Sequence, residues 1–257
     1  MLSIPADYTG TSGTPLVLDL HGFTLNKEIE GTLDSVGAKG AAKGFIVVTP
    51  DAVGSLRSWN MFKVDQEPDD FQFVSELLAD LTTKLCIDPN RVYTTGISNG
   101  SAFSALLACT APYRFAAIGM VSATIGPTCP DDVRVPVMAF HGTADPVVPY
   151  RGGTVNSPAA LGHDAPPVEQ AVKEWAQHDG CSSTPQEQTI APTVRRIVYP
   201  DCAPGMDVSL YSLQGSGHTW PGGLDVQKLG IAQFGATNLD VDATDLLLEF
   251  FTSHPKA

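Results

Sequence analysis

Three polar residues in this sequence have the types and the order that nucleophilic catalysis by a serine requires. Ser98 lies in the segment RVYTTGISNGSAF (91–103), at the centre of the pattern G-x-S-x-G, and Asp145 and His218 follow it along the chain. A serine hydroxyl becomes a strong nucleophile when an imidazole accepts its proton and a carboxylate orients that imidazole. The five-letter pattern alone is weak evidence in a chain rich in glycine and serine. Whether Ser98 is a catalytic nucleophile therefore depends on the helices and strands that position these residues.

The hydrophobic pattern predicts strands that alternate with helices. Short, nearly continuous apolar runs are typical of buried parallel strands, and apolar residues at helical spacing follow most of them. The predicted strands are 15–23, 44–50, 91–96, 115–123, 135–142, 193–200 and 208–214, the last two forming a pair near a sheet edge. The predicted helices are 69–85, 99–110, 168–178 and 240–254. We therefore expect a single α/β domain over residues 1–257, with a mostly parallel, doubly wound sheet in a three-layer α/β/α arrangement.

Ser98, Asp145 and His218 each follow a predicted strand directly. Ligand sites of such sheets lie beyond the carboxyl ends of the strands. The order Ser, Asp, His is that of the α/β-hydrolase fold, whose nucleophile sits on a tight strand-to-helix turn. These residues therefore predict a triad in which His218 takes the proton of Ser98 and Asp145 holds the imidazole.

An oxyanion hole needs two N–H donors beside the nucleophile. The backbone N–H of Asn99, at the start of the helix after Ser98, is the first predicted donor. The second should come from LHGFT (20–24), and Phe23 is preferred to Thr24 as the donor. His21 and Gly22 are expected to shape this loop rather than to react.

Structural explanations compete with this interpretation. Ser98 fits an ordinary strand-to-helix turn, and Asp145 fits a turn or a helix cap. The tripeptide Asn99-Gly100-Ser101 matches an N-glycosylation site, which a buried Asn99 would exclude. Because Asp145 and His218 agree with Ser98 in both order and placement, we favour catalysis.

Composition limits the remaining function classes. The net charge of −13 and the pI near 4.6 disfavour nucleic acid and anionic membranes as partners, since both attract Lys and Arg. No apolar run approaches the length that spans a bilayer. The five cysteines contain no C-x-x-C pair, and no metal-binding spacing is present, so we expect neither a metal nor another cofactor.

Taken together, the motifs LDLHGFT, RVYTTGISNG, AFHGTADPVVPY, GCSS…YPDC and GSGHTWPGG resemble the polyhydroxybutyrate depolymerase and feruloyl esterase group of α/β-hydrolases. The resemblance runs from about residue 15 to the C-terminus. It implies a cofactor-free Ser-His-Asp esterase that acts on feruloyl, short-chain acyl or polyhydroxyalkanoate-type esters. It also implies disulfides between Cys181 and Cys202 and between Cys109 and Cys129, with Cys86 free.

The resemblance implies an exported protein, secreted or periplasmic. The first ten residues, MLSIPADYTG, have neither the basic nor the apolar segment of a signal peptide. Either a leader has been removed or the protein is intracellular, and the sequence leaves both open.

Loop aromatic residues are candidates for substrate contact. Trp59 lies in a polar loop (54–62) and Trp220 follows His218 by two residues; together with Thr24 they are predicted to bind substrate. For Trp59 a role in pinning its loop onto the core is an equal alternative, and Trp175 is expected in the core. Two other functions remain open, namely a peptidase on the same fold and a catalytically silent protein that binds carbohydrate or polymer.

Overall fold

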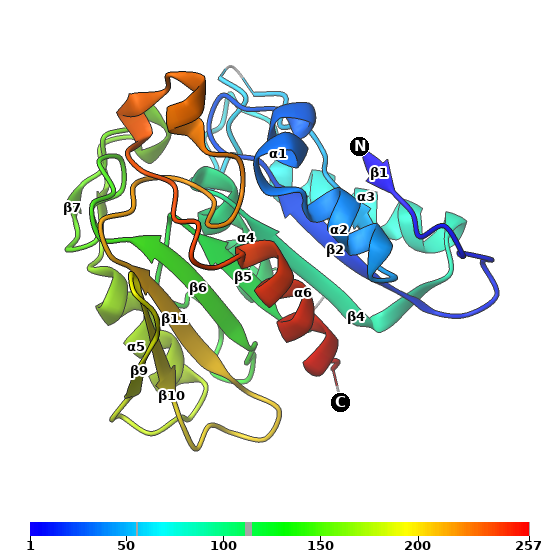
Figure 1. Cartoon of the computed structure of the whole chain (residues 1–257). Helices are drawn as coiled ribbons and strands as arrows, with labels where there is room; N and C mark the ends of the chain where they lie inside the picture. Colours follow the sequence, from blue (N-terminus) through cyan, green and yellow to red (C-terminus); the bar gives the residue numbers. More distant parts are fainter. Residues whose placement is uncertain (55, 111–114, 257) are drawn as a thin grey trace.

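A nine-stranded sheet runs through the molecule (Figure 1), whose computed structural model describes residues 1–54, 56–110 and 115–256. The strand order is β1-β3-β2-β4-β5-β6-β11-β10-β9. The six central strands from β3 to β11 are parallel, whereas β1, β10 and β9 run antiparallel to their neighbours. The strands are β1 (Leu2–Ser3), β2 (Thr14–Leu20), β3 (Ile46–Val48), β4 (Ile87–Gly96), β5 (Ile118–Val121), β6 (Val137–Gly142), β9 (Gln186–Ala191), β10 (Val194–Tyr199) and β11 (Val208–Leu213).

Helices cover both faces of this sheet. They are α1 (Lys27–Asp34), α2 (Val36–Ala42), α3 (Asp70–Lys84), α4 (Asn99–Thr110), α5 (Val168–His178) and α6 (Ala243–Ser253). A two-stranded hairpin, β7 (Gly153–Thr154) with β8 (Asp164–Ala165), and three 3₁₀ turns (Pro158–Ala160, Val226–Leu229, Ala232–Phe234) lie outside the sheet. Figure 1 shows α2 and α6 in front of the sheet and α5 behind it.

The alternation of side chains along β2 separates the two halves of the core. Leu16, Leu18 and Leu20 pack in one buried cluster with apolar residues of α3, α4 and α5. Val17 points to the opposite face and belongs to a second cluster that includes residues of α2 and α6. Successive side chains of a strand point to opposite faces, so a strand buried on both sides must be apolar almost throughout. The expected three-layer α/β/α arrangement is therefore confirmed.

Two of the predicted helices begin directly after a capping aspartate. Asp69 caps α3 by accepting a hydrogen bond from the N–H of Gln72 at 3.0 Å, and Asp242 caps α6 through the N–H of Asp245 at 3.0 Å. A carboxylate at this position satisfies an N–H that has no partner inside the helix and complements the helix dipole.

The predicted strand pair near a sheet edge is confirmed: β10 and β11 are antiparallel neighbours, and only β9 separates them from that edge. On its other side β11 pairs in parallel with β6, so it is buried throughout. The edge strand is β9, whose polar sequence QEQTIA was not predicted as a strand. Both α1 and α2 were also missed, because each has only seven or eight residues.

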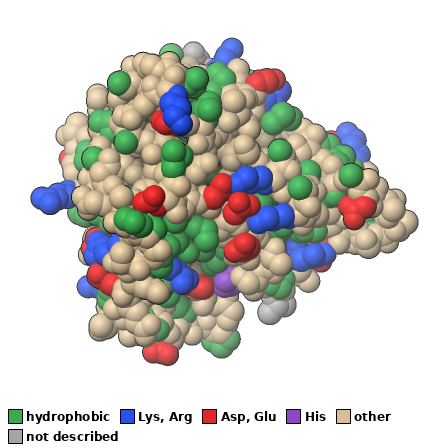
Figure 2. Space-filling view, viewed as in Figure 1, with side chains coloured by type: hydrophobic (Ala, Val, Ile, Leu, Met, Phe, Trp, Pro, Cys, Tyr) green, Lys and Arg blue, Asp and Glu red, His purple; other side chains and the backbone are tan. Residues whose placement is uncertain are grey.

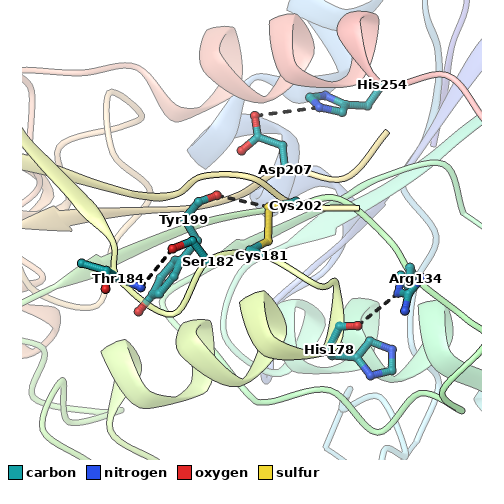
Figure 3. The surroundings of a disulfide bond; sticks show 9 residues. All are labelled: Arg134, His178, Cys181, Ser182, Thr184, Tyr199, Cys202, Asp207 and His254. Carbon is teal, nitrogen blue, oxygen red and sulfur yellow. Dashed lines mark hydrogen bonds and ion pairs between the residues drawn. A yellow bond between two sulfur atoms is a disulfide. The ribbon is translucent and has the colours of Figure 1, made fainter. Parts of the chain in front are cut away.

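Both predicted disulfides are present, and Cys86 is free. Cys181 follows α5 and Cys202 follows β10, so this bond joins the loop after a helix to the loop after a strand of the sheet (Figure 3). Arg134 donates a hydrogen bond to the carbonyl oxygen of His178, at the end of α5, at 3.2 Å. This end of the molecule holds the amino end of β11, opposite the end where the candidate site lies.

The surface shown in Figure 2 mixes charges of both signs. Where α2 and α6 meet, Lys39 is paired with Asp242 and Asp245, and Lys43 lies 3.0 Å from Asp245. Among the described residues, no helix is both long and apolar enough to cross a bilayer.

Candidate active site

Ser98 occupies a strained turn between β4 and α4. Its φ is 57°, in the left-handed region that non-glycine residues rarely adopt. Its N–H donates to the carbonyl oxygen of Val121 at 2.9 Å, and α4 begins at the next residue. This is the geometry of a nucleophile elbow, which presents a serine hydroxyl above the carboxyl ends of the strands.

Gly100 makes the turn possible because it brings α4 against the end of β2. A Cβ at this position would overlap the carbonyl oxygen of Leu20 and lie 2.6 Å from that of His21. Only glycine permits so close an approach of two backbones. The G-x-S-x-G pattern thus has a steric cause in this fold.

Asp145 and His218 form a hydrogen-bonded pair. The Nδ1 of His218 lies 2.8 Å from Oδ2 of Asp145, and both side chains are largely buried. The other carboxylate oxygen accepts the N–H groups of Val147 at 2.8 Å and Val148 at 2.9 Å. A carboxylate fixed in this way keeps the hydrogen of His218 on Nδ1 and leaves Nε2 free to accept a proton.

The carboxylate of Asp145 stays ionised despite its burial. Burial alone would raise its pKa, but hydrogen bonds from His141 and His218 outweigh burial and hold the pKa well below its usual range. The negative charge is therefore available at all ordinary pH values to stabilise a protonated His218.

His141 is a contact that the sequence interpretation missed. Because His141 precedes Asp145 in the chain, it stands in the wrong order for the catalytic base of this fold. In the structure its buried Nε2 donates to the carbonyl oxygen of Val148 at 2.9 Å and lies 3.4 Å from Oδ2 of Asp145. It is thus a positioning residue for the acid, and the spacing H-x-x-x-D in FHGTAD was the only available signal.

Ser98 and His218 line one cavity, which we call the His218-side cavity. No hydrogen bond joins their side chains in the described part of the chain. Catalytic hydrogen bonds are often long without substrate and tighten in the reacting complex. The arrangement therefore brings the hydroxyl, the imidazole and the carboxylate to one place, in the order that the sequence predicted.

Two N–H groups are available beside Ser98. Within the described residues, the backbone N–H groups of Phe23 and Asn99 have no acceptor. The N–H of Thr24 instead donates to the carbonyl oxygen of Arg57 at 3.2 Å, which agrees with the preference for Phe23. Phe23 lines a cavity together with Ser98, and Asn99 is the residue after Ser98, so both unpaired donors belong to the neighbourhood where an oxyanion hole is required.

His21 holds the loop that contains Phe23. Its Nδ1 donates to the carbonyl oxygen of Gly22 at 2.8 Å, while Nε2 accepts the N–H of Ala52 at 3.0 Å. Burial lowers the pKa of His21, so the ring is kept neutral, as these two contacts demand. The expectation that His21 shapes the loop agrees with these contacts.

Of the two alternatives for Trp59, its burial favours a role in pinning its loop onto the core over contact with substrate. Its side chain is 1% exposed, stacks on Phe103 at 5.6 Å between ring centroids, and donates from Nε1 to the carbonyl oxygen of His21 at 2.9 Å. It therefore pins its loop onto the core and supports the loop 20–24 that contains Phe23, which we call the oxyanion loop. Position 55 in the loop of Trp59 lies outside the described residues. Trp175, as expected, is fully buried.

The side chain of Asn99 holds the same loop from the other side. Its Oδ1 accepts the N–H of Trp59 at 2.7 Å, and its Nδ2 donates to the carbonyl oxygen of Trp59 at 3.2 Å. Asn99 is 5% exposed, so it is not accessible as a glycosylation acceptor in the folded protein.

Thr24 and Trp220 both line the His218-side cavity, as their predicted contact with substrate requires. Thr24 is exposed at its mouth. Trp220 is largely buried, and its Nε1 donates to the hydroxyl of Thr244 at 2.9 Å. Trp220 can therefore offer only part of its ring to a ligand.

A second cavity meets the first at Ser98. This α4-side cavity is lined by Ser98, by Asn99 and Ala102 of α4, and by the β7–β8 hairpin loop. The apolar residues Ala123, Ile125 and Val148 line it as well. Ser157 of that loop lines both cavities. Ser98 thus lies between the two cavities, and the β7–β8 hairpin loop borders both of them.

Three buried carboxyl groups lie behind the oxyanion loop. Asp19, Glu30 and Asp34 have oxygens within 4.8 Å of one another, close enough to share protons or a cation. Burial raises the pKa of Asp19 to about 7, and burial together with the neighbouring acids raises the pKa values of Glu30 and Asp34. One oxygen of Glu30 accepts the N–H of Gly22 at 3.4 Å. The cluster thus reaches the oxyanion loop without facing the cavities.

This sheet, with a strained serine between strand and helix and an Asp–His pair in the loops after β6 and β11, defines the α/β-hydrolase class. The sequence model of the esterase PHB depolymerase family matches residues 6–155, more than half of the chain. The chain belongs to this family, which confirms the resemblance and agrees with the expected ester hydrolase.

Individual proteins support this assignment. Feruloyl esterase B of Piromyces equi is 29% identical over 227 residues, which cover 85% of this chain and 42% of that protein. The chain thus spans less than half the length of that relative. Among solved structures, an acetyl xylan esterase from Aspergillus awamori has a TM-score of 0.65 at 16% identity and covers 98% of this chain and 93% of its own. Esterase PE8 has a TM-score of 0.55 at 19% identity, covering 98% and 99%. These two structures show the shared fold.

Proposed function

We propose that this protein is a serine esterase that hydrolyses carboxylic esters through an acyl-enzyme on Ser98. The observation that carries the proposal is the strained Ser98 at φ 57°, placed in one cavity with His218, whose imidazole is bound to the ionised Asp145. Strain of this kind persists where the surrounding structure imposes it, most often at functional sites.

Acylation begins when Nε2 of His218 takes the proton of the Ser98 hydroxyl. The Ser98 oxygen then attacks the ester carbonyl carbon, and the carbonyl oxygen becomes negatively charged. The N–H groups of Phe23 and Asn99 donate hydrogen bonds to this oxygen, while Asp145 stabilises the protonated His218. Collapse of the intermediate breaks the bond to the alcohol, which leaves with the proton of His218.

Deacylation repeats these steps with water. His218 takes a proton from a water molecule, whose oxygen attacks the acyl-enzyme carbonyl, and the same two N–H groups stabilise the second oxyanion. Collapse releases the acid and returns the proton to Ser98. The balance is one ester and one water consumed, one acid and one alcohol formed, with no cofactor.

We propose feruloyl, short-chain acyl or polyhydroxyalkanoate-type esters as substrates. The name of the family and that of the Piromyces equi relative support this range. A single catalytic domain is supported by the continuous sheet, which includes strands from Leu2 to Leu213. Export is supported by the two disulfides, because such bonds persist in oxidising compartments.

Replacement of the nucleophile tests the proposal. Ser98→Ala should lower the turnover of p-nitrophenyl acetate at least 1,000-fold, because removal of a nucleophile leaves only binding and the oxyanion hole. The thermal unfolding temperature should not fall, since the smaller side chain removes no hydrogen bond. Turnover within tenfold of the wild type would refute the role of Ser98.

Two comparisons separate the other candidate functions. A peptidase would cleave p-nitroanilide amides at rates comparable to the corresponding esters. A silent binding protein would bind a polymer without any turnover of esters. The ionised Asp145 and the intact pair with His218 favour turnover over silent binding.

A further inference from the structure

The two cavities at Ser98 differ in their relation to His218. His218 lines only the larger cavity, whose volume including its open mouth is about 1000 Å³. The α4-side cavity measures about 570 Å³ and includes Ser98 but not the imidazole. In ester cleavage the leaving oxygen must receive its proton from the imidazole, so the alcohol group must lie on the side of His218. The acyl group, which stays bonded to Ser98, then extends the other way.

The His218-side cavity offers an alcohol group little to hydrogen-bond. Leu25, Ile29, Leu33, Leu224, Val226 and Ile231 contribute apolar side chains, and no Lys, Arg, Asp or Glu lines it among the described residues. Thr24, Asn156, Ser157 and Thr219 also line it. The hydroxyls of Thr24 and Thr219 donate to the backbone carbonyl oxygens of Phe23 and Ala236, and the hydroxyl of Ser157 accepts the N–H of Ala159 at 3.3 Å. The amide of Asn156 is thus the main uncharged polar side chain that the cavity offers besides His218. A sugar carries several hydroxyl groups that lose water on binding and need new partners, whereas an alkyl or aryl group does not.

The α4-side cavity is mostly apolar, with the polar residues His163 and Asp164 lining it at the hairpin loop, and it is bounded on the outside. Ala102, Ala123 and Val148 form a small buried cluster at its base. Phe62 stacks on His163 with 4.6 Å between ring centroids, and this pair joins the loop of Trp59 to the β7–β8 hairpin loop across the cavity. The space is therefore limited by contacts between two loops.

We propose that the His218-side cavity is the alcohol subsite and takes an apolar alcohol group, while the α4-side cavity binds the acyl group. The assignment rests on the proposed function and extends it to a substrate class, esters that are apolar on both sides of the bond. Esters of sugar hydroxyls fit this site poorly.

Substrates that share one acetyl group test the alcohol side. The wild type should hydrolyse hexyl acetate with a kcat/KM at least tenfold above that for ethyl acetate, since each fully buried CH₂ contributes roughly fourfold. Hexyl acetate should also exceed an acetylated methyl xyloside at least tenfold. Equal or higher kcat/KM for the xyloside would overturn the apolar assignment.

Two variants that fill one cavity each test the assignment of sides. Leu224→Trp, at a residue 37% exposed, should lower the ratio of hexyl to ethyl acetate at least fivefold and leave the ratio of p-nitrophenyl octanoate to acetate within twofold. Ala160→Trp, at a half-buried residue of the hairpin loop, should lower the ratio of p-nitrophenyl octanoate to acetate at least fivefold. It should leave the ratio of hexyl to ethyl acetate within twofold. If either variant fails to fold, Ile231→Trp and Ala159→Trp replace them.

The outcomes separate this assignment from the proposed function. If the reverse pattern appears, or if both variants are active and neither ratio changes, the assignment of sides is wrong although the enzyme is a Ser98 esterase. If the wild type cleaves no ester, or Ser98→Ala keeps its turnover, the proposed function itself fails.

Discussion

At the residue scale, the account depends on the ionised Asp145. Four groups surround its carboxylate: the N–H groups of Val147 and Val148 on one oxygen and the imidazoles of His141 and His218 on the other. The backbone N–H groups fix the position of the carboxylate. The Nδ1–H of His218 donates the hydrogen bond that matters for proton transfer. The negative charge of Asp145 can therefore be removed by substitution while the backbone hydrogen bonds from Val147 and Val148 are kept.

Asp145→Asn should lower kcat for p-nitrophenyl acetate about 1,000-fold to 10,000-fold. The Asn carbonyl oxygen can still accept the backbone N–H groups, but its NH₂ group would face Nδ1 of His218 and favour the tautomer with hydrogen on Nε2. That tautomer cannot accept the proton of Ser98. Steady-state assays with purified protein measure kcat, and Asp131→Asn, at an exposed position that lines neither cavity, is the control. A variant that keeps more than a tenth of kcat would contradict the role given to Asp145.

The sequence predicted the three reacting residues but not the side-chain contacts, such as those of His141 and Trp59, that position them. Ser98, Asp145 and His218 follow predicted strands, so the fold rule alone brings them to one end of the sheet. The contact of His141 with Asp145 depends on the path of the loop after β6, and the burial of Trp59 depends on Phe103 and His21, which are distant in sequence. Such side-chain contacts between segments leave no local pattern.

At the element scale, the junction of β2 and α4 decides whether the site forms. Residues of β2 lead into the oxyanion loop, and α4 carries the nucleophile turn; Gly100 lets the two approach. The apolar runs in the sequence predict that both β2 and α4 are buried. The edge strand β9 was not predicted, because it pairs with one neighbour only and its residues are mostly exposed.

Gly100→Ala should destabilise the protein and abolish activity, because the new methyl group overlaps backbone atoms that cannot move aside. We expect the thermal unfolding temperature to fall by more than 5 °C, given that ~1 kcal/mol corresponds to ~2–4 °C at this chain length. Gly37→Ala in α2 is the matched control, since its Cβ would meet only the movable side chains of Ser3 and Met1. Similar unfolding temperatures for the two variants would argue against the close approach.

At the scale of the whole molecule, buried carboxyl groups make stability depend on pH. Burial raises the pKa of Asp19 to about 7 and, in a separate place, that of Asp179 to about 7. Above about pH 4 the unfolded chain loses these protons while the folded chain keeps them, so stability falls as pH rises from about 4 through 7. Asp145 acts oppositely: its lowered pKa contributes stability above about pH 4 that is lost in acid.

The unfolding temperature should therefore decrease from pH 5 to pH 8, and Asp19→Asn should reduce this decrease. The amide stays neutral in both states, so it removes one source of the pH dependence. Scanning calorimetry in the presence of a chelator measures the effect without a bound cation. Asp80→Asn, at an exposed position of α3, serves as control. Parallel curves for Asp19→Asn and the wild type would exclude Asp19 as a contributor.

The most direct test of the central claim is covalent labelling with a fluorophosphonate, followed by peptide mapping. An activated serine attacks the phosphorus and displaces fluoride, so the protein gains one organophosphonyl group at the nucleophile. We predict a single modification on Ser98 that proceeds in step with the loss of esterase activity. A label on another residue, or full loss of activity with Ser98 unmodified, would contradict the account.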